Sequence, residues 1–241
     1  MSGYAIIRCI HGKFELVKGG FLVNPDYSAI SSDAKKDYYK GLIFPILWLA
    51  LMTSIVITNI IPPQYADYFY MLYFGGIFIY YVFVKRDFSI KIFFTDMRTA
   101  VFWKYALLCI LLLALAYGVG TIPFMLAPDK NIIFTEFRYT RAYDIPTKIA
   151  FFFSAILFPA LGQELFYRKA IICFSSKNKL VLSVIIGTLL FAINDNLDLY
   201  GLFRSFLVGL AFAIPYVKTR NINIPIFAHY FVSITMTVTF G

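Results

Sequence analysis

Seven long apolar segments, separated by short polar stretches, dominate the hydrophobic pattern of the chain. They cover residues 41–61, 66–84, 103–127, 149–176, 180–196, 200–217 and 222–240. About 20 apolar residues in helical form cross the ~30 Å hydrocarbon core of a bilayer. Proline and charged residues between the segments support this division, because Pro62-Pro63 ends the first segment and Lys85-Arg86 ends the second. The pattern predicts an all-α fold, a polytopic transmembrane helix bundle of about seven spans.

The residues before the first apolar segment have a different pattern. Hydrophobic and polar positions alternate over Tyr4–Ile10 and Lys13–Val17. A period of two predicts a small β-hairpin, and a segment lying in the membrane interface is the alternative. We divide the chain into a cytoplasmic N-terminal segment (1–40), N-terminal transmembrane helices (41–148) and a C-terminal group of core helices (149–241).

Composition supports a membrane protein and argues against an ordinary soluble domain. Hydrophobic residues make up 60% of the 241 residues and charged residues only 15%, whereas soluble domains carry roughly 25% charged residues. The net charge of +9 does not indicate a nucleic-acid partner, because the basic residues lie mainly in loops. The three cysteines, Cys9, Cys109 and Cys173, are scattered and show neither a disulfide framework nor a zinc pattern.

The distribution of the basic residues predicts the orientation. With the N-terminus inside, sixteen of the 22 Lys and Arg residues fall on the inner side, four fall in outer loops, and Arg168 and Arg204 lie within spans. Inner loops of membrane proteins carry such an excess of Lys and Arg. We therefore expect an integral membrane protein, in contact with lipid, with a cytoplasmic N-terminus and an outer C-terminus.

The fourth apolar segment contains two charged residues, Glu164 and Arg168. A charge at the bilayer centre costs about 3 kcal/mol on insertion scales, so such residues usually have a partner or a function. A spacing of four residues places the two side chains on one face of a helix, where they can pair. A buried ion pair that only fixes helix packing explains this pair as well as catalysis does.

The last three segments hold further polar residues, namely Asn194, Asp195, Arg204, His229 and Ser233. At about 1.5 Å per residue, Asp195 lies roughly 24 Å from Lys179 and His229 about 14 Å from Arg220. Straight helices would therefore leave Asp195 too deep to meet His229. Structural interpretations remain open, because Asp195 can counter Arg204 at the outer interface and a membrane histidine often only hydrogen-bonds a neighbouring helix.

Three spaced motifs link these residues. They are Gln163-Glu164-x-x-x-Arg168, Phe191-x-x-x-Asp195 and His229-x-x-x-Ser233. Together they resemble the CPBP family of CAAX proteases and bacteriocin-processing enzymes, also called the Abi family. The pattern of that family is Glu-Glu-x-x-x-Arg, Phe-x-x-x-His and His-x-x-x-Asn on consecutive C-terminal helices. The resemblance covers residues 150–240.

The resemblance implies a protein of a bacterial inner membrane, with a helical intramembrane peptidase core whose cavity is open to the cytoplasm and to lipid. It implies that the residue at position 163 activates water, that positions 195, 229 and 233 hold the oxyanion, and that Glu164 pairs with Arg168. Gln163, Asp195 and Ser233 depart from the family pattern. An amide cannot take a proton from water, and an aspartate repels a developing oxyanion. Each loss typically lowers the rate by a factor of about 100 or more.

These departures predict a non-catalytic protein that binds a peptide or a membrane-protein partner in a cytoplasm-facing cavity, in an immunity or regulatory role. The alternative is an active CAAX-type or leader-peptide endopeptidase. Its catalytic residues would be Glu164, Asp195 and His229, supported by Gln163, Arg168, Phe191 and Ser233. A transporter or channel is a third class, although the chain has no pair of similar halves.

The same three catalytic candidates are enough in number to bind a divalent metal, since a catalytic zinc normally has three protein ligands. Glu164 is, however, expected to be engaged by Arg168. We therefore expect no metal and no other cofactor.

Overall fold

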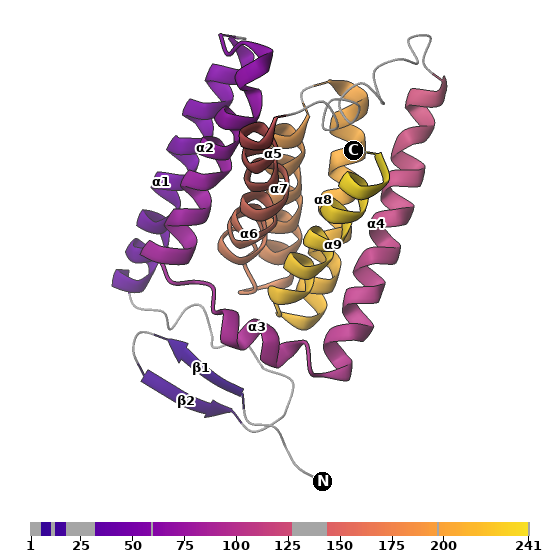
Figure 1. Cartoon of the computed structure of the whole chain (residues 1–241). Coiled ribbons are helices and arrows are strands. Elements are labelled where there is room, and N and C mark those ends of the chain that lie inside the picture. The colour runs from indigo at the N-terminus through magenta and orange to yellow at the C-terminus, as the bar shows by residue number, and fades with distance from the viewer. Residues whose placement is uncertain are drawn as a thin grey trace.

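The computed structural model describes residues 6–10, 13–17, 32–58, 60–126, 144–196 and 198–240. The helices are α1 (Ser32–Ile57), α2 (Ala66–Ile79), α3 (Ile90–Asp96), α4 (Ala100–Leu126), α5 (Ile145–Phe151), α6 (Phe158–Gln163), α7 (Lys177–Asp195), α8 (Leu199–Thr219) and α9 (Asn223–Phe240). Shorter helical turns are η2 (Pro63–Tyr65), η3 (Tyr80–Val84), η6 (Phe152–Leu157) and η7 (Glu164–Ala170), of which the last three have the wider π geometry. The predicted all-α membrane bundle is confirmed (Figure 1).

All seven predicted apolar segments fall on helices. Five described spans are long and apolar enough to cross a membrane, namely Ala66–Val84, Ala100–Pro123, Ile145–Ala170, Lys177–Asp195 and Leu199–Thr219. Shorter apolar stretches, Gly41–Ile57 and Asn223–Val238, belong to α1 and α9. The largest difference is at the first boundary, because α1 begins at Ser32, ahead of the predicted start at residue 41.

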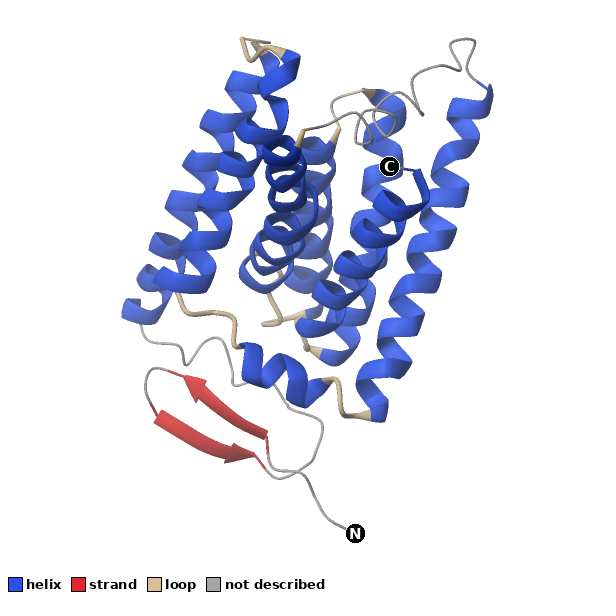
Figure 2. Cartoon of the chain, in the orientation of Figure 1, coloured by secondary structure: helices blue, strands red, loops and turns tan. Residues whose placement is uncertain are grey.

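The predicted hairpin is also present. Strands β1 (Ile6–Ile10) and β2 (Lys13–Val17) pair in antiparallel register from Ile6 opposite Val17 to Ile10 opposite Lys13. The pair is drawn in red in Figure 2. The two residues that connect the strands, His11 and Gly12, lie outside the described residues.

Helix α8 lies at the centre of the packing. It contacts α4, α7 and α9, while α2 packs against α6 and η6, and α1 packs against α2 at the edge of the bundle (Figure 1). The main buried cluster includes Leu165, Phe166, Phe191, Phe212 and Ile226, which come from η7, α7, α8 and α9. The hydrophobic core therefore lies between the helices that carry the three sequence motifs.

The connection between α2 and α4, residues 85–99, crosses one end of the bundle and contains α3 (Figure 1). The Lys169 Nζ atom donates to Asp87 Oδ1 over 2.7 Å and to the Asp87 carbonyl oxygen over 2.6 Å. Asp96 Oδ2 accepts from the side-chain amides of Asn221 (2.9 Å) and Asn223 (2.6 Å). These bonds attach the connection to η7 and to the start of α9, the two elements that carry Glu164 and His229.

The span Ile145–Ala170 is one continuous helical rod with two π turns. Asp144 caps its N-terminus by accepting from the Thr147 backbone N–H over 3.0 Å. Hydrogen bonds from the Thr147 side chain and backbone lower the pKa of the Asp144 carboxyl. The turn η6 directly precedes α6, in which Pro159 stands at the start. Because proline lacks an N–H and clashes with the preceding turn, the wider geometry of η6 accommodates it.

Candidate functional site

Glu164 and Arg168 form a buried ion pair within η7. The Arg168 Nε atom lies 3.2 Å from Glu164 Oε2, and the two side chains are 2% and 0% exposed. Both residues lie in the π-helical turn that ends the fourth span, a geometry that often marks functional sites. The pairing that the four-residue spacing predicts is confirmed.

Aromatic rings surround the Arg168 guanidinium. Its Cζ atom lies 4.5 Å from the ring centre of Phe191 and 5.2 Å from that of Phe212. Its Nη2 atom donates to the Gly209 carbonyl oxygen over 3.2 Å, and its Nη1 atom makes no hydrogen bond to any described residue. Cation–π contacts and the carboxylate of Glu164 together compensate for removing this charge from water. Phe191 thus contributes the wall of the arginine pocket.

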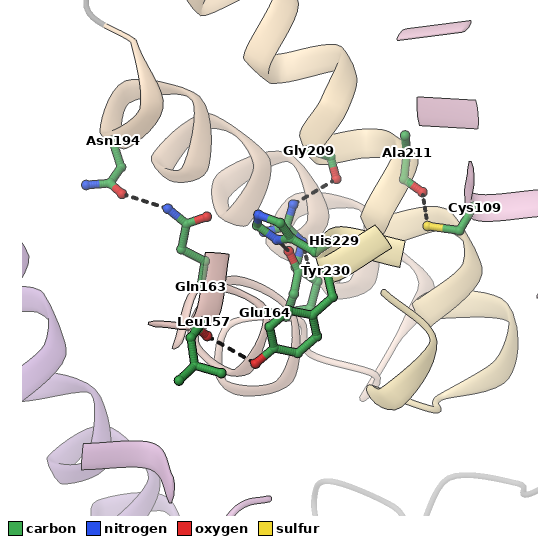
Figure 3. Close-up of polar contacts among 10 residues, drawn as sticks. Cys109, Leu157, Gln163, Glu164, Asn194, Gly209, Ala211, His229 and Tyr230 are labelled. Atoms are coloured by element: carbon green, nitrogen blue, oxygen red, sulfur yellow. Dashed lines mark hydrogen bonds and ion pairs between the residues drawn. The ribbon is translucent and has the colours of Figure 1, made fainter. Parts of the chain in front are cut away.

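His229 of α9 contacts the other oxygen of the same carboxylate. Its Nδ1 atom lies 3.0 Å from Glu164 Oε1 (Figure 3). The imidazole ring stacks on Phe212 with ring centres 4.8 Å apart and an interplanar angle of 21°. With a carboxylate as acceptor, Nδ1 is assigned the proton. The His229 side chain is 13% exposed and is the edge of the cluster that reaches the surface. Both oxygens of Glu164 are therefore held by basic side chains.

Gln163 points away from this cluster. Its Nε2 atom donates to Asn194 Oδ1 over 3.4 Å (Figure 3). Asn194 donates in turn to the Tyr73 hydroxyl, which lies 2.9 Å from Thr53 Oγ1. The side chain at position 163 therefore belongs to a row of polar groups that joins α6, α7, α2 and α1. The four residues of this row are Gln163, Asn194, Tyr73 and Thr53.

The structure does not bring Asp195 together with Glu164 and His229. Asp195 is exposed at the C-terminal end of α7, and its hydrogen bonds among the described residues come from Ser205 Oγ and Asn196 Nδ2. It lies four residues beyond Phe191, about 6 Å further along the helix axis. Because Phe191 already lies beside Arg168, Asp195 lies beyond the cluster, at the end of the bundle where α7 ends.

Ser233, the last motif residue, lies half-buried on α9 one turn beyond His229. Its backbone carbonyl oxygen accepts from Thr237 Oγ1 over 2.8 Å. Of the seven motif residues, the structure therefore gathers Glu164, Arg168, Phe191 and His229 at one place. These are the four that agree with the family pattern.

The donor set at this cluster does not fit a catalytic metal with three protein ligands. Within the described part of the chain, no three His, Cys, Asp or Glu side chains come together. Glu164 and His229 are two potential ligands, but Glu164 is already bound by Arg168 on one oxygen and by His229 on the other. The third candidate, Asp195, is bonded to Ser205 instead.

Several residues of the site were not identified from the sequence. Thr53 and Ser205 are polar residues in apolar segments, a signal that indicates a buried partner. Tyr73 gives no such signal, because it is one of 18 tyrosines in the chain. Phe212 stacks on His229 but belongs to no spaced motif. Tyr230, whose hydroxyl donates to the Leu157 carbonyl oxygen over 3.1 Å (Figure 3), fixes α9 against η6.

Comparison with known proteins agrees with this geometry. Residues 145–235, from the start of α5 into α9, match the family model described as Rce1-like, type II CAAX prenyl endopeptidase Rce1-like. The match contains all three motifs and confirms the resemblance to the CPBP family that the motifs indicate. No curated protein and no solved structure matches the chain. The chain is thus an integral membrane protein whose C-terminal core is intramembrane-peptidase-like.

Proposed function

We propose that this protein has the scaffold of an intramembrane CAAX-type peptidase but does not cleave peptides. It instead binds a peptide or a membrane-protein partner from the cytoplasmic side of a bacterial inner membrane, in an immunity or regulatory role. The family match supports the scaffold, and the excess of basic residues at one end of the bundle supports the orientation.

The observation that carries the proposal is the state of Glu164. One of its oxygens lies 3.2 Å from Arg168 Nε and the other 3.0 Å from His229 Nδ1. A general base must be within hydrogen-bond reach of the proton that it removes. Each oxygen of Glu164 lies beside a basic side chain, although Oε2 accepts no hydrogen bond from the described residues. The preceding residue, Gln163, carries an amide bonded to Asn194.

The surface edge of the cluster supports a binding role. Of the four motif residues in the cluster, His229 alone is partly exposed, and the other three are buried. Its ring offers Nε2 for a hydrogen bond to a ligand. Glu164 fixes the ring orientation and Phe212 covers one ring face. A backbone N–H group of a bound peptide can thus donate to Nε2 of a rigidly held His229 ring, within an otherwise apolar wall.

A binding experiment in which the bound peptide is recovered and checked for cleavage tests the proposal. Protein in lipid nanodiscs is titrated with fluorescent farnesylated CAAX peptides and with leader-type peptides, and each peptide is then recovered for mass spectrometry. We expect saturable binding and full-length peptide, with binding at least about tenfold weaker in His229→Ala, the loss expected for a contact of about 1.4 kcal/mol. Cleaved peptide, or no saturable binding of either peptide class, would contradict the proposal.

A second function rests on the bond between Glu164 and His229. A carboxylate that accepts from Nδ1–H leaves Nε2 as a proton acceptor, which is the arrangement of an oriented general base. On this view the protein is an active endopeptidase in which His229 is the base and Glu164 its positioning residue. Turnover that disappears in His229→Ala distinguishes this function from the first.

A further inference from the structure

An apolar groove runs along the outer face of α1, far from the motif residues in the chain. It is lined by Ile43, Phe44, Leu47, Trp48 and Leu51 and has a volume of about 500 Å³. Leu47 and Leu51 are 64% and 56% exposed. The groove is shallow and open to its surroundings, and all five lining residues come from α1.

The floor of the groove is a fixed surface. Trp48 Nε1 donates to the Tyr73 carbonyl oxygen over 2.8 Å. The Trp48 ring lies so close to Gly76 of α2 that a Cβ atom at that glycine would come within 2.4 Å of it. Phe44 stacks near Trp48 with ring centres 5.9 Å apart and packs on Tyr80 at 4.8 Å. A ligand in the groove therefore meets a preformed aromatic wall.

One end of the groove carries positive charge. The Lys85 ammonium lies beside Gly41, one turn before Phe44, since a Cβ atom at Gly41 would meet Lys85 Nζ at 2.8 Å. Tyr80 joins the two elements there by donating to the Gly41 carbonyl oxygen over 2.9 Å. Within the described residues, neither Lys85 nor the adjacent Arg86 forms an ion pair. The nearest acidic neighbour in sequence, Asp87, is bound by Lys169.

The length of the groove matches one leaflet of a bilayer. Gly41 and Leu51 are ten residues apart, which corresponds to about 15 Å of helix. The hydrocarbon core of a bilayer is about 30 Å thick, so the groove spans about half of it. Its charged end then lies at the level of the lipid headgroups, and its apolar part lies at the depth of the acyl chains.

We propose that this groove is a binding site for an anionic phospholipid. The phosphodiester pairs with Lys85, and one acyl chain lies along Leu47, Trp48 and Leu51. Charge complementarity favours this occupant, because each basic residue at the membrane surface raises the affinity for an anionic lipid about five-fold. A zwitterionic lipid gains less from this cation, and a second copy of the chain would bring its own basic residues to the same place.

Tryptophan quenching by brominated lipids tests the site. The chain has two tryptophans, so Trp103→Phe leaves Trp48 as the only reporter. The protein is reconstituted with a low mole fraction of phosphatidylglycerol or phosphatidylcholine, each brominated on its acyl chains. We expect the phosphatidylglycerol to occupy the groove about five-fold more readily, and we expect Lys85→Gln to remove this preference.

Two matched variants separate a specific site from a general surface potential. Lys91→Gln removes an exposed cation from α3 in the same connection, and we expect it to keep the preference for the anionic lipid. Lys85→Arg keeps the charge and should also retain it, which shows that position 85 tolerates substitution. Equal quenching by the two lipids, a preference that survives Lys85→Gln, or shielding of Trp48 in a dimer would overturn the proposal.

Discussion

Glu164 is the residue on which the buried cluster depends. It is fully buried, and its two oxygens face Arg168 and His229. The Arg168 guanidinium, which lies beside Phe191 and Phe212, has no other anion within salt-bridge distance among the described residues. Removing the Glu164 charge would therefore leave a buried cation without compensation.

Replacing Glu164 alone should destabilise the protein strongly. We expect Glu164→Leu to lower the free energy of unfolding by about 3–5 kcal/mol, the usual effect of breaking a buried ion pair from one side. Denaturant unfolding in detergent micelles, followed by tryptophan fluorescence, measures the change.

The double variant Glu164→Leu/Arg168→Met is the control for this prediction. Replacing both partners of a buried pair by apolar residues is often close to neutral. The double variant should therefore be more stable than Glu164→Leu. If it is less stable than the single variant, the account of Arg168 as an uncompensated charge is wrong.

At the scale of elements, α7 and η7 are in close contact at Gly187. A Cβ atom at this position would lie 2.6 Å from the backbone carbonyl oxygen of Tyr167, which a side-chain movement cannot relieve. The contact holds α7 beside the turn that carries Glu164 and Arg168, and Phe191 follows Gly187 by one turn on the same helix. The lack of a Cβ atom at position 187 thus allows α7 to pack closely enough to position the wall of the arginine pocket.

Gly187→Ala should therefore destabilise the core. We expect a loss of about 1–3 kcal/mol, as for other overpacked sites, measured by the same unfolding experiment. Gly118→Ala on α4 is the matched control, because a Cβ atom there meets nothing within 4 Å. Alanine favours a helix over glycine by up to about 1 kcal/mol, so the control should be neutral or stabilising. Equal effects of the two substitutions would refute the close contact.

At the scale of the whole molecule, charge is distributed unevenly between the two ends of the bundle. The connection 85–99, the start of α7 and the turn between α8 and α9 carry basic residues at the end where α3 lies (Figure 1). Lys148 near the start of α5 is at the opposite end. From the positive-inside rule we expect the α3 end to lie in the cytoplasm.

Cysteine labelling in intact cells checks this orientation. In a background without Cys9, Cys109 and Cys173, we expect Lys148→Cys to react with a membrane-impermeant maleimide added outside. Lys91→Cys should react only after the cells are permeabilised. The reverse pattern would show that the chain has the opposite orientation.

Local patterns predict the spans and the central pair, whereas packing determines the remaining contacts. The apolar segments and the spacing of Glu164 and Arg168 depend only on composition and helical periodicity, and both predictions are confirmed. The bond between Asn194 and Tyr73 joins residues 121 positions apart, and no periodicity encodes it. The same holds for Asp195, which pairs with Ser205 because of where α7 ends against α8.

The turnover of a CAAX-type substrate in proteoliposomes tests the central claim, that the core keeps the scaffold of a peptidase but does not cleave peptides. The rate of hydrolysis of a fluorogenic farnesylated peptide is compared between the native protein and His229→Ala, and an active type II CAAX endopeptidase serves as the positive control. The account predicts that the two rates are indistinguishable from each other and from empty liposomes. Hydrolysis by the native protein that is lost in His229→Ala would contradict it.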